Sequence, residues 1–350
     1  MIKYLSQNDG DKIKEFYESA YGRKHILNNA THHDWQFKNN PLNKLKNKTI
    51  VVFEDNKKIY SQMGLIPFEL KLFNSIKTAL WHVSFFTLPS YRGKGIGRKL
   101  IEFTDNETDY SLVLGGSIGT NKIYEKMGGT NFGNLNRHIA ILDKEKLEKC
   151  IKNKIENEEV KYETSELELE QIKKLDEKYD EFWNQVKERY PITVNRTRNY
   201  LKWRYFDNPL LNYKIFQLKE KNEIKGFLVL RIEDNNLELK AGRIIDIVVF
   251  EKFEKQLFQE IINFCKNKVD VIDFFCTGNF YKNSLSTERF FNDPNNELKI
   301  PALFNPINFN KFGGINLLCK TNSKSEIKEK INDINKMYFV KGDSDQDRAN

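Results

Sequence analysis

Residues 85–97 read FFTLPSYRGKGIG, and this stretch decides the expected fold. A β-rich run ends at Pro89, a glycine-rich turn follows, and the turn opens a helix on which Ile96, Leu100 and Phe103 recur at helical spacing. The first amides of a helix have no partner within it, and the helix dipole is positive at that end. The stretch therefore predicts an anion site where a strand passes into a helix.

The turn also has the side chains that suit a phosphate-bearing ligand. Its three glycines leave the backbone open to close approach, and Arg92, Lys94 and Arg98 add positive charge. No G-K-[ST] follows, which excludes a Walker A loop, and the glycine spacing excludes a dinucleotide-binding fingerprint. A plain structural turn, or a site for another phosphate ligand, is the alternative interpretation.

The run resembles the R-x-x-G-x-G signature of the GCN5-related N-acetyltransferase (GNAT) family. This resemblance implies the acyl-CoA N-acyltransferase fold, an α/β structure in which helices flank a mixed, mainly antiparallel sheet. It also implies that acetyl-CoA is the co-substrate, that the turn binds its pyrophosphate, and that the preceding strand pairs with the pantetheine arm. The cofactor-binding residues implied here are Phe86, Thr87, Leu88, Arg92, Gly93, Lys94, Gly95, Ile96 and Gly97.

A second segment, residues 120–129, resembles the family's N-x-x-A-x-x-L-Y-x-K-x-G-F motif. The resemblance implies further cofactor contacts at Ser117 and Asn121, and it places Tyr124 where the family has the tyrosine that protonates the departing thiolate. A buried position on an amphipathic helix is an equally good interpretation of Tyr124. The family's asparagine, alanine and final phenylalanine are replaced by Ser117, Thr120 and Gly129, which puts the details of the pantetheine contact in doubt.

The general base is the least defined part of the expected site. His82 lies on the strand that leads into the turn, and a histidine can titrate near neutral pH. His82 is therefore the candidate base, although a lone histidine between Trp81 and Val83 is more often structural. The predicted catalytic residues are thus Tyr124 and His82.

An internal repeat accounts for the length of the chain. Residues 35–42 (WQFKNNPL) and 203–210 (WRYFDNPL) both fit W-x-(aromatic)-x-x-N-P-L. Two copies of a β-α-β-β-β-α-β unit are predicted; chance similarity in a sequence rich in asparagine and aromatic residues is the alternative. The predicted divisions are a GNAT domain with the acetyl-CoA site at 1–145, a degenerate GNAT-like domain at 146–340 and a disordered tail at 341–350.

The second copy is not expected to bind coenzyme A. Alignment of Phe264 with Phe103 puts Phe253, Gln256 and Phe258 at the positions of Arg92, Gly95 and Gly97. Bulky side chains there would keep a phosphate from the backbone. The second domain is expected to form one wall of the acceptor pocket or to stabilise the first domain, and its candidate acceptor contacts are Arg243, Asp246 and Tyr281.

Hydrophobic periodicity predicts the individual elements. The expected helices span 12–21, 95–103, 121–127, 171–190 and 253–264. The expected strands span 2–5, 49–53, 59–72 with an interruption at Pro67, 79–87, 110–114, 139–142, 213–217, 227–232, 244–250 and 269–275.

Composition limits the class of protein. A net charge of +8 over 350 residues is mild, and no concentrated basic stripe indicates a nucleic-acid partner. The four cysteines have no CxxC or zinc-site spacing, so no metal site is expected, and free thiols suit a reducing compartment. No signal peptide and no apolar run of membrane-span length is present, so we expect a cytoplasmic protein without a membrane partner.

The sequence predicts an N-acetyltransferase that moves an acetyl group from acetyl-CoA to a primary amine of a small acceptor. An amino sugar, or a nucleotide-linked sugar, is the first candidate acceptor, by analogy at the level of the family. Two alternatives stay open. One is a non-catalytic acyl-CoA-binding protein, and the other is a tRNA-dependent aminoacyl transferase of the peptidoglycan-bridge type, which would not need an intact pyrophosphate turn.

Overall fold

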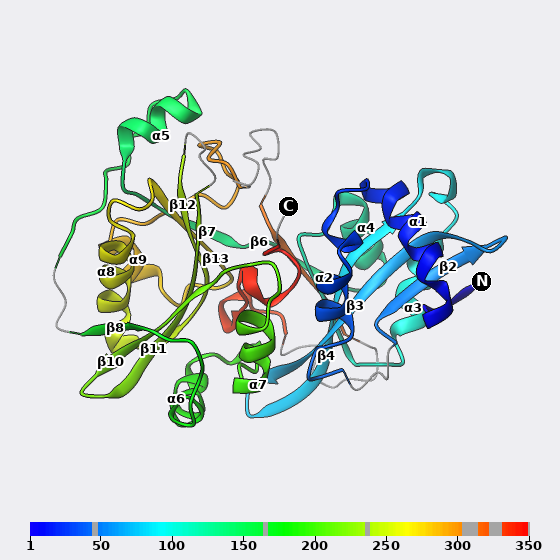
Figure 1. Ribbon diagram of the computed structural model, residues 1–350, viewed down its shortest axis with the longest axis horizontal. Coiled ribbons are helices and arrows are strands. Elements are labelled where there is room, and N and C mark those ends of the chain that lie inside the picture. The colour runs from blue at the N-terminus through cyan, green and yellow to red at the C-terminus, as the bar shows by residue number, and fades with distance from the viewer. Residues whose placement is uncertain (44–47, 164–166, 235–238, 303–313, 322–330, 349–350) are drawn as a thin grey trace.

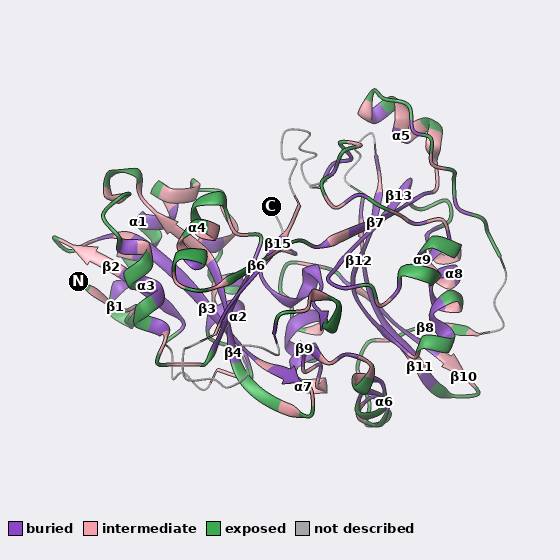
Figure 2. Cartoon of the chain, turned by 180° about the vertical axis from the view of Figure 1, so that it is seen from behind, coloured by how far each residue is buried: buried purple, intermediate pink, exposed green. Residues whose placement is uncertain are grey.

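Two β-sheets with flanking helices lie side by side in the computed structural model (Figure 1). It describes residues 1–43, 48–163, 167–234, 239–302, 314–321 and 331–348. Both sheets are mainly antiparallel, which confirms the predicted α/β fold class. Most strand residues of both sheets are buried, as Figure 2 shows.

The first sheet has the strand order β1-β2-β3-β4-β5-β15-β6. Along this order, neighbouring strands are antiparallel except for β4 and β5, which run parallel because helix α3 connects them. The strands are β1 (Ile2–Tyr4), β2 (Ile50–Asp55), β3 (Lys58–Leu72), β4 (Ser75–Thr87), β5 (Tyr110–Leu114), β6 (Thr130–Asn134) and β15 (Asn316–Thr321), and the helices are α1 (Gly10–Tyr21), α2 (Ala30–Phe37), α3 (Ile96–Thr104) and α4 (Ile118–Lys126).

Alternate strand residues of this sheet face two different hydrophobic cores. Val51 and Leu65 pack in one core with Leu100 of α3 and Tyr124 of α4. The other core takes α1, α2 and the neighbouring strand residues, and it continues without a break into the second sheet. The two halves of the molecule therefore share a core on the α1/α2 face, while α3 and α4 cover the opposite face.

The second sheet repeats the order of the first, as β8-β10-β11-β12-β13-β7-β14. Its one parallel pair in the described structure, β12 with β13, lies at the same place in the order as β4 with β5. The strands are β7 (Asn136–Ile141), β8 (Glu168–Gln171), β10 (Lys214–Glu220), β11 (Glu223–Glu233), β12 (Ala241–Val249), β13 (Val271–Cys276) and β14 (Phe291–Asn292), and the helices are α5 (Lys144–Ile151), α6 (Lys178–Val186), α7 (Arg198–Leu201), α8 (Glu254–Cys265) and α9 (Lys282–Thr287).

The two halves exchange one strand. β7 leaves the first half and pairs with β13 and β14, whereas β15 returns from the second half and lies between β5 and β6. The strand predicted at 139–142 as the last of the first domain therefore lies in the other sheet. A boundary at residue 145 therefore does not separate the two sheets. The sequence did not predict this exchange, because the hydrophobic pattern of a strand does not report which sheet the strand joins.

Two further expectations fail for local reasons. β3 runs unbroken through Pro67, which pairs with Leu80 and whose carbonyl accepts a hydrogen bond of 2.8 Å from the Asn40 side chain. The helix predicted over 171–190 is confined to α6 and a 3-10 turn at Lys187–Arg189, while its first residue ends β8. The short strands β9 (Ile192–Val194) and β16 (Met337–Tyr338), which the sequence analysis missed, link the halves through the end of β3.

The two repeat segments meet in a reciprocal contact. The indole of Trp35 donates to the carbonyl of Trp203 at 2.8 Å, and the indole of Trp203 donates to the carbonyl of Trp35 at 2.9 Å. The rings stack with centroids 5.4 Å apart. Asn40 and Asn208 also make equivalent hydrogen bonds, since the side-chain oxygen of each accepts from the backbone amide two residues later in the chain. The repeat thus places equivalent residues about a local pseudo-twofold relation.

The C-terminal segment, residues 341–348, is ordered between the sheets, and the prediction of a disordered tail is wrong for these residues (Figure 1). Lys341, Asp343, Asp345 and Asp347 are all at least 94% buried. The segment is polar, as a disordered tail would be, but buried arginines of the second half pair with it. Arg196 binds both oxygens of Asp343 at 3.0 Å, and Arg231 binds Asp347 at 2.6 Å.

We predict that Arg196→Met lowers the free energy of unfolding by about 3–5 kcal/mol, because removing one partner of a buried ion pair leaves the others uncompensated. Arg196 also binds Asp246 at 3.0 Å, so the variant leaves two buried carboxylates without their guanidinium. Urea unfolding measures the loss. Arg23→Met is the control, since that side chain is 88% exposed and should change little; equal effects would contradict the role given to Arg196.

Candidate functional site

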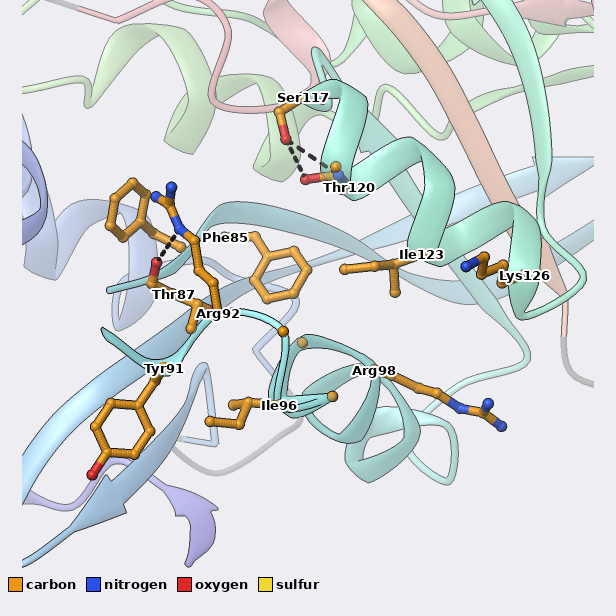
Figure 3. Close-up of a pocket in the computed structure, with 15 residues that line it drawn as sticks. Phe85, Thr87, Tyr91, Arg92, Ile96, Arg98, Ser117, Thr120, Ile123 and Lys126 are labelled. Atoms are coloured by element: carbon orange, nitrogen blue, oxygen red, sulfur yellow. Dashed lines mark hydrogen bonds between the residues drawn. The ribbon is translucent and has the colours of Figure 1, made fainter. Parts of the chain in front are cut away.

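The parallel pairing of β4 and β5 ends early and opens the sheet. Leu80 pairs with Ser111 and Trp81 with Leu112, and beyond these two pairs the strands separate. A cavity of about 790 Å³ lies beyond the point of separation (Figure 3). Figure 3 shows Ser117, Thr120, Ile123 and Lys126 of the α4 region on one side and Tyr91, Arg92, Ile96 and Arg98 on the other, with Phe85 between them.

The glycine turn opens onto this cavity. Gly93 and Gly95 have φ of +78° and +71°, and a Cβ at either position would meet no atom within 4 Å. Gly95 is the N-cap of α3, so the first amides of that helix lie beside open space. Gly97 has a different reason to be glycine, because a Cβ there would lie 3.0 Å from the Phe85 ring and 3.1 Å from Ile123. It allows α3, β4 and α4 to approach closely.

The charged side chains that line the cavity are all cationic. Arg92, Arg98 and Lys126 line it, and no acidic residue does so among the described residues. Arg92 lies back against the strand, with its Nε donating to the Thr87 carbonyl at 3.0 Å and its guanidinium 5.1 Å from the centre of the Phe86 ring. Arg98 is 65% exposed and pairs with Glu102 along the helix. The cavity therefore suits a flexible ligand that carries several negative charges.

The structure brings most of the predicted cofactor-binding residues to this cavity. The lining includes Phe86, Thr87, Arg92, Gly93, Gly95, Ile96, Gly97 and Ser117. Three others do not line it. The amide of Leu88 is taken by the Tyr60 carbonyl at 2.8 Å, the Lys94 ammonium lies 4.1 Å from the centre of the Tyr91 ring, and the Asn121 side chain accepts from Asn316 at 2.9 Å.

A bulge in β4 shapes the inner end of the opening. Val83 pairs with Gly64 and Phe86 with Gln62, so Ser84 and Phe85 face a single residue of β3. Ser84 has φ of +49°, and its carbonyl accepts from the Tyr21 hydroxyl at 2.7 Å and from the Gln62 side chain. The sequence analysis missed this bulge, because serine does not require a left-handed conformation and no glycine or proline marks the position.

A second cavity of about 240 Å³ adjoins the first. Phe85, Ser117 and Thr120 line both. The second cavity extends past the bulge, where Tyr21, His25 and three residues of the C-terminal segment, Asp345, Gln346 and Arg348, also line it. The sequence analysis assigned none of these five residues to the site, since they are distant in the chain and carry no motif.

Comparison with known proteins bears on the part of the chain that carries this site. Residues 1–128 match the sequence profile described as the acetyltransferase (GNAT) domain. These residues form a GNAT domain. The match covers about a third of the chain, and no curated protein matches the sequence.

Solved structures show the same fold over most of the chain. A GCN5-related N-acetyltransferase from Anabaena variabilis has a TM-score of 0.59 at 14% identity, and the match covers 79% of this chain and 65% of that one, just under two thirds of its length. A probable N-acyltransferase from Enterococcus faecalis also has a TM-score of 0.59, at 10% identity, covering 92% and 72%. N-myristoyltransferase of Saccharomyces cerevisiae with bound myristoyl-CoA has a TM-score of 0.54 at 10% identity, covering 91% and 82%.

The two predicted catalytic residues form a buried pair behind the cavities of the GNAT domain. The Tyr124 hydroxyl is hydrogen-bonded to Nδ1 of His82, and Nε2 of His82 lies 3.4 Å from the Thr104 hydroxyl. His82 contributes to the wall of the smaller cavity, whereas Tyr124 is fully buried and is not among the lining residues of either. Burial lowers the pKa of His82 to about 3 and raises that of Tyr124 well above its usual value. Neither shift favours proton transfer near neutral pH.

Within the part of the second half that the structure describes, no counterpart of the glycine turn is present. Phe253 and Phe258 are buried, and Phe258 packs against Tyr281 and Phe290. The candidate acceptor contacts there are also buried and engaged with protein: Arg243 lies 3.4 Å from Asp273, Asp246 binds Arg196, and Tyr281 bonds Tyr190 at 2.6 Å. None of the three lines either cavity of the site, so they serve the core of the second sheet.

The described residues also bear on metal binding and on membrane insertion. No cluster of three or more histidine, cysteine or acidic side chains is arranged to hold a metal ion there. Among the same residues, no helix has the length and apolar character needed to cross a membrane.

We predict that the imidazole of His82 does not titrate between pH 5 and 9 in the folded protein, because burial holds its pKa far below this interval. The free energy of unfolding should fall as the pH drops below about 6.5, since the unfolded chain then takes up a proton that the folded state refuses. NMR of the imidazole carbons, assigned with His82→Gln, measures the first effect. A folded-state pKa near 6.5 would contradict the assignment.

Proposed function

We propose that this protein transfers an acetyl group from acetyl-CoA to the primary amine of a small acceptor, such as an amino sugar. The observation that carries the proposal is the cationic cavity at the separated ends of β4 and β5, with the open amides of the glycine turn at its rim. The predicted cofactor contacts that line the cavity remain part of this proposal, with Phe85, Arg98, Thr120, Ile123 and Lys126 added to them.

The volumes and lining residues of the two cavities support a placement of acetyl-CoA in the larger cavity and of the acceptor in the smaller one. The larger cavity suits the nucleotide, the diphosphate and the pantetheine arm, because the cations Arg92, Arg98 and Lys126 line it together with the apolar side chains of Phe85 and Ile123. The smaller cavity, at the bulge, suits a compact acceptor. A thioester that enters through the larger cavity would place its acyl carbon where the two cavities meet, beside Phe85, Ser117 and Thr120.

The chemistry requires little beyond alignment of the two reactants. An amine nitrogen attacks the thioester carbonyl carbon, and the tetrahedral intermediate expels the thiolate. We propose that Tyr124 and His82 stabilise the wall behind this position rather than exchange protons with substrate, because both are buried and bonded to each other.

We predict that Gly95→Glu weakens acetyl-CoA binding by roughly 100-fold or more, because it puts a carboxylate beside the diphosphate and like charges in contact cost several kcal/mol. Isothermal titration calorimetry measures the affinity. Gly133→Glu is a matched control, since Gly133 also has φ of +78° and open surroundings but lies in β6, outside the cavity. Equal weakening by both variants, or none by Gly95→Glu, would overturn the assigned phosphate site.

We predict that Tyr124→Phe leaves kcat little changed but lowers the free energy of unfolding by about 1–3 kcal/mol, because it removes the buried partner of His82. Thiol release from acetyl-CoA with an amine acceptor measures kcat, and urea unfolding measures stability. A fall in kcat of about 100-fold at unchanged stability would instead identify Tyr124 as the proton donor.

The same assay separates the proposal from its alternatives. A non-catalytic acyl-CoA-binding protein would bind acetyl-CoA and release no thiol with any amine. An aminoacyl transferase that uses charged tRNA would tolerate Gly95→Glu, because it does not need the pyrophosphate turn.

A further inference from the structure

The smaller cavity is completed by a segment from the far end of the chain. Asp345 is the one acidic residue among its lining residues, and it is 94% buried. Gln346 lies beside it, and its amide donates to the Leu114 carbonyl, at the end of β5, at 2.9 Å. The carboxylate thus lies where β4 and β5 separate, which is the place given above to the acceptor.

Contacts from both halves fix the position of the Asp345 side chain. The Ser84 hydroxyl of the β4 bulge donates to its Oδ2 at 3.1 Å, and the Gln346 amide donates to its Oδ1 at 3.1 Å. Arg348 lies 3.6 Å from Oδ2, on a side chain that is 38% exposed. An ion pair with so exposed a side chain is weak, so a bound cation can displace Arg348 from the carboxylate.

The second half holds this segment on either side of Asp345. Arg196 and Arg204 bind Asp343 and the carbonyls of Gly342 and Ser344, and Arg231 with Tyr213 binds Asp347. The three arginines are buried or nearly so. The backbone on both sides of Asp345 is therefore fixed, which keeps the carboxylate at the cavity instead of in solvent.

We propose that Asp345 binds the ammonium group of the acceptor and takes a proton from it, so that the acceptor is a small cationic amine. This inference rests on the proposed acetyl transfer. A buried carboxylate in a cavity of about 240 Å³ favours a compact cation over a neutral or anionic acceptor. The rings of Tyr21 and His25, stacked with centroids 4.4 Å apart, also line this cavity and suit a cation.

The proton balance of the step is simple. The ammonium gives one proton to Asp345, and the nitrogen lone pair then forms the C–N bond to the thioester carbonyl. As the C–S bond breaks, the sulfur keeps the bonding pair and takes the second nitrogen proton. The products are an amide and a free thiol, and Asp345 returns its proton to solvent.

The test compares Asp345→Asn and Asp345→Glu with the unaltered chain. Thiol release from acetyl-CoA is followed with ethanolamine, glucosamine and cadaverine as acceptors, and acetyl-CoA affinity is measured separately by calorimetry. We expect Asp345→Asn to lower kcat/KM for the amine by about 100-fold or more, as loss of a general base does, with acetyl-CoA affinity unchanged. Asp345→Glu, which keeps the charge, should retain more activity than Asp345→Asn. Asp333→Asn, outside both cavities, is the charge-matched control.

The outcomes distinguish the two proposals. If the unaltered chain acetylates these amines and Asp345→Asn does so equally well, the role of Asp345 is refuted while the transferase stands. If it binds acetyl-CoA but acetylates none of the three amines, the small cationic acceptor is refuted. If it does not bind acetyl-CoA, the proposed function itself fails.

Discussion

The site depends on one constraint, the early end of parallel pairing between β4 and β5. Two residue pairs join the strands, and beyond them the peptide groups on the facing edges of β4 and β5 no longer pair with each other. Buried backbone groups without partners cost free energy, so such an opening persists only where water or a ligand can satisfy them. An extended ligand with amide groups can pair with such a strand edge, as a peptide does in β-augmentation. The bulge at Ser84 keeps the opening in place, because its carbonyl is held by Tyr21 and Gln62 and turned away from β5.

The second half contributes to this site although it has no glycine turn of its own. It shares a core with the first half, exchanges a strand with it, and holds the C-terminal segment against the end of β5. The matching strand orders and the reciprocal Trp35–Trp203 contact support a proposed duplication of one ancestral unit. In that view one copy kept the phosphate turn, and the other filled the equivalent corner with Phe253 and Phe258. Its present part is to position polar residues at the cavity of the first copy.

Local pattern was enough to predict the turn at residues 92–97, the α/β class and most strand and helix positions, because these follow from glycine, proline and hydrophobic spacing. The exchange of strands could not be predicted, since the sequences of β7 and β15 do not report which of the two sheets each strand joins. The C-terminal segment was misread because acidic residues favour disorder unless cations are buried beside them. Arg196, Arg204 and Arg231 lie more than a hundred residues earlier in the chain. The environment of the candidate base could not be predicted for a similar reason, since burial lowers the pKa of His82 and its neighbours in sequence do not reveal that burial.

A crystal structure with coenzyme A bound tests the central claim most directly. The account predicts that the diphosphate lies on the amides of residues 93–97 and that the pantetheine arm lies between β4 and β5, with its sulfur near Phe85 and Ser117. Coenzyme A bound elsewhere on the molecule, or strands β4 and β5 closed against each other in the complex, would contradict it.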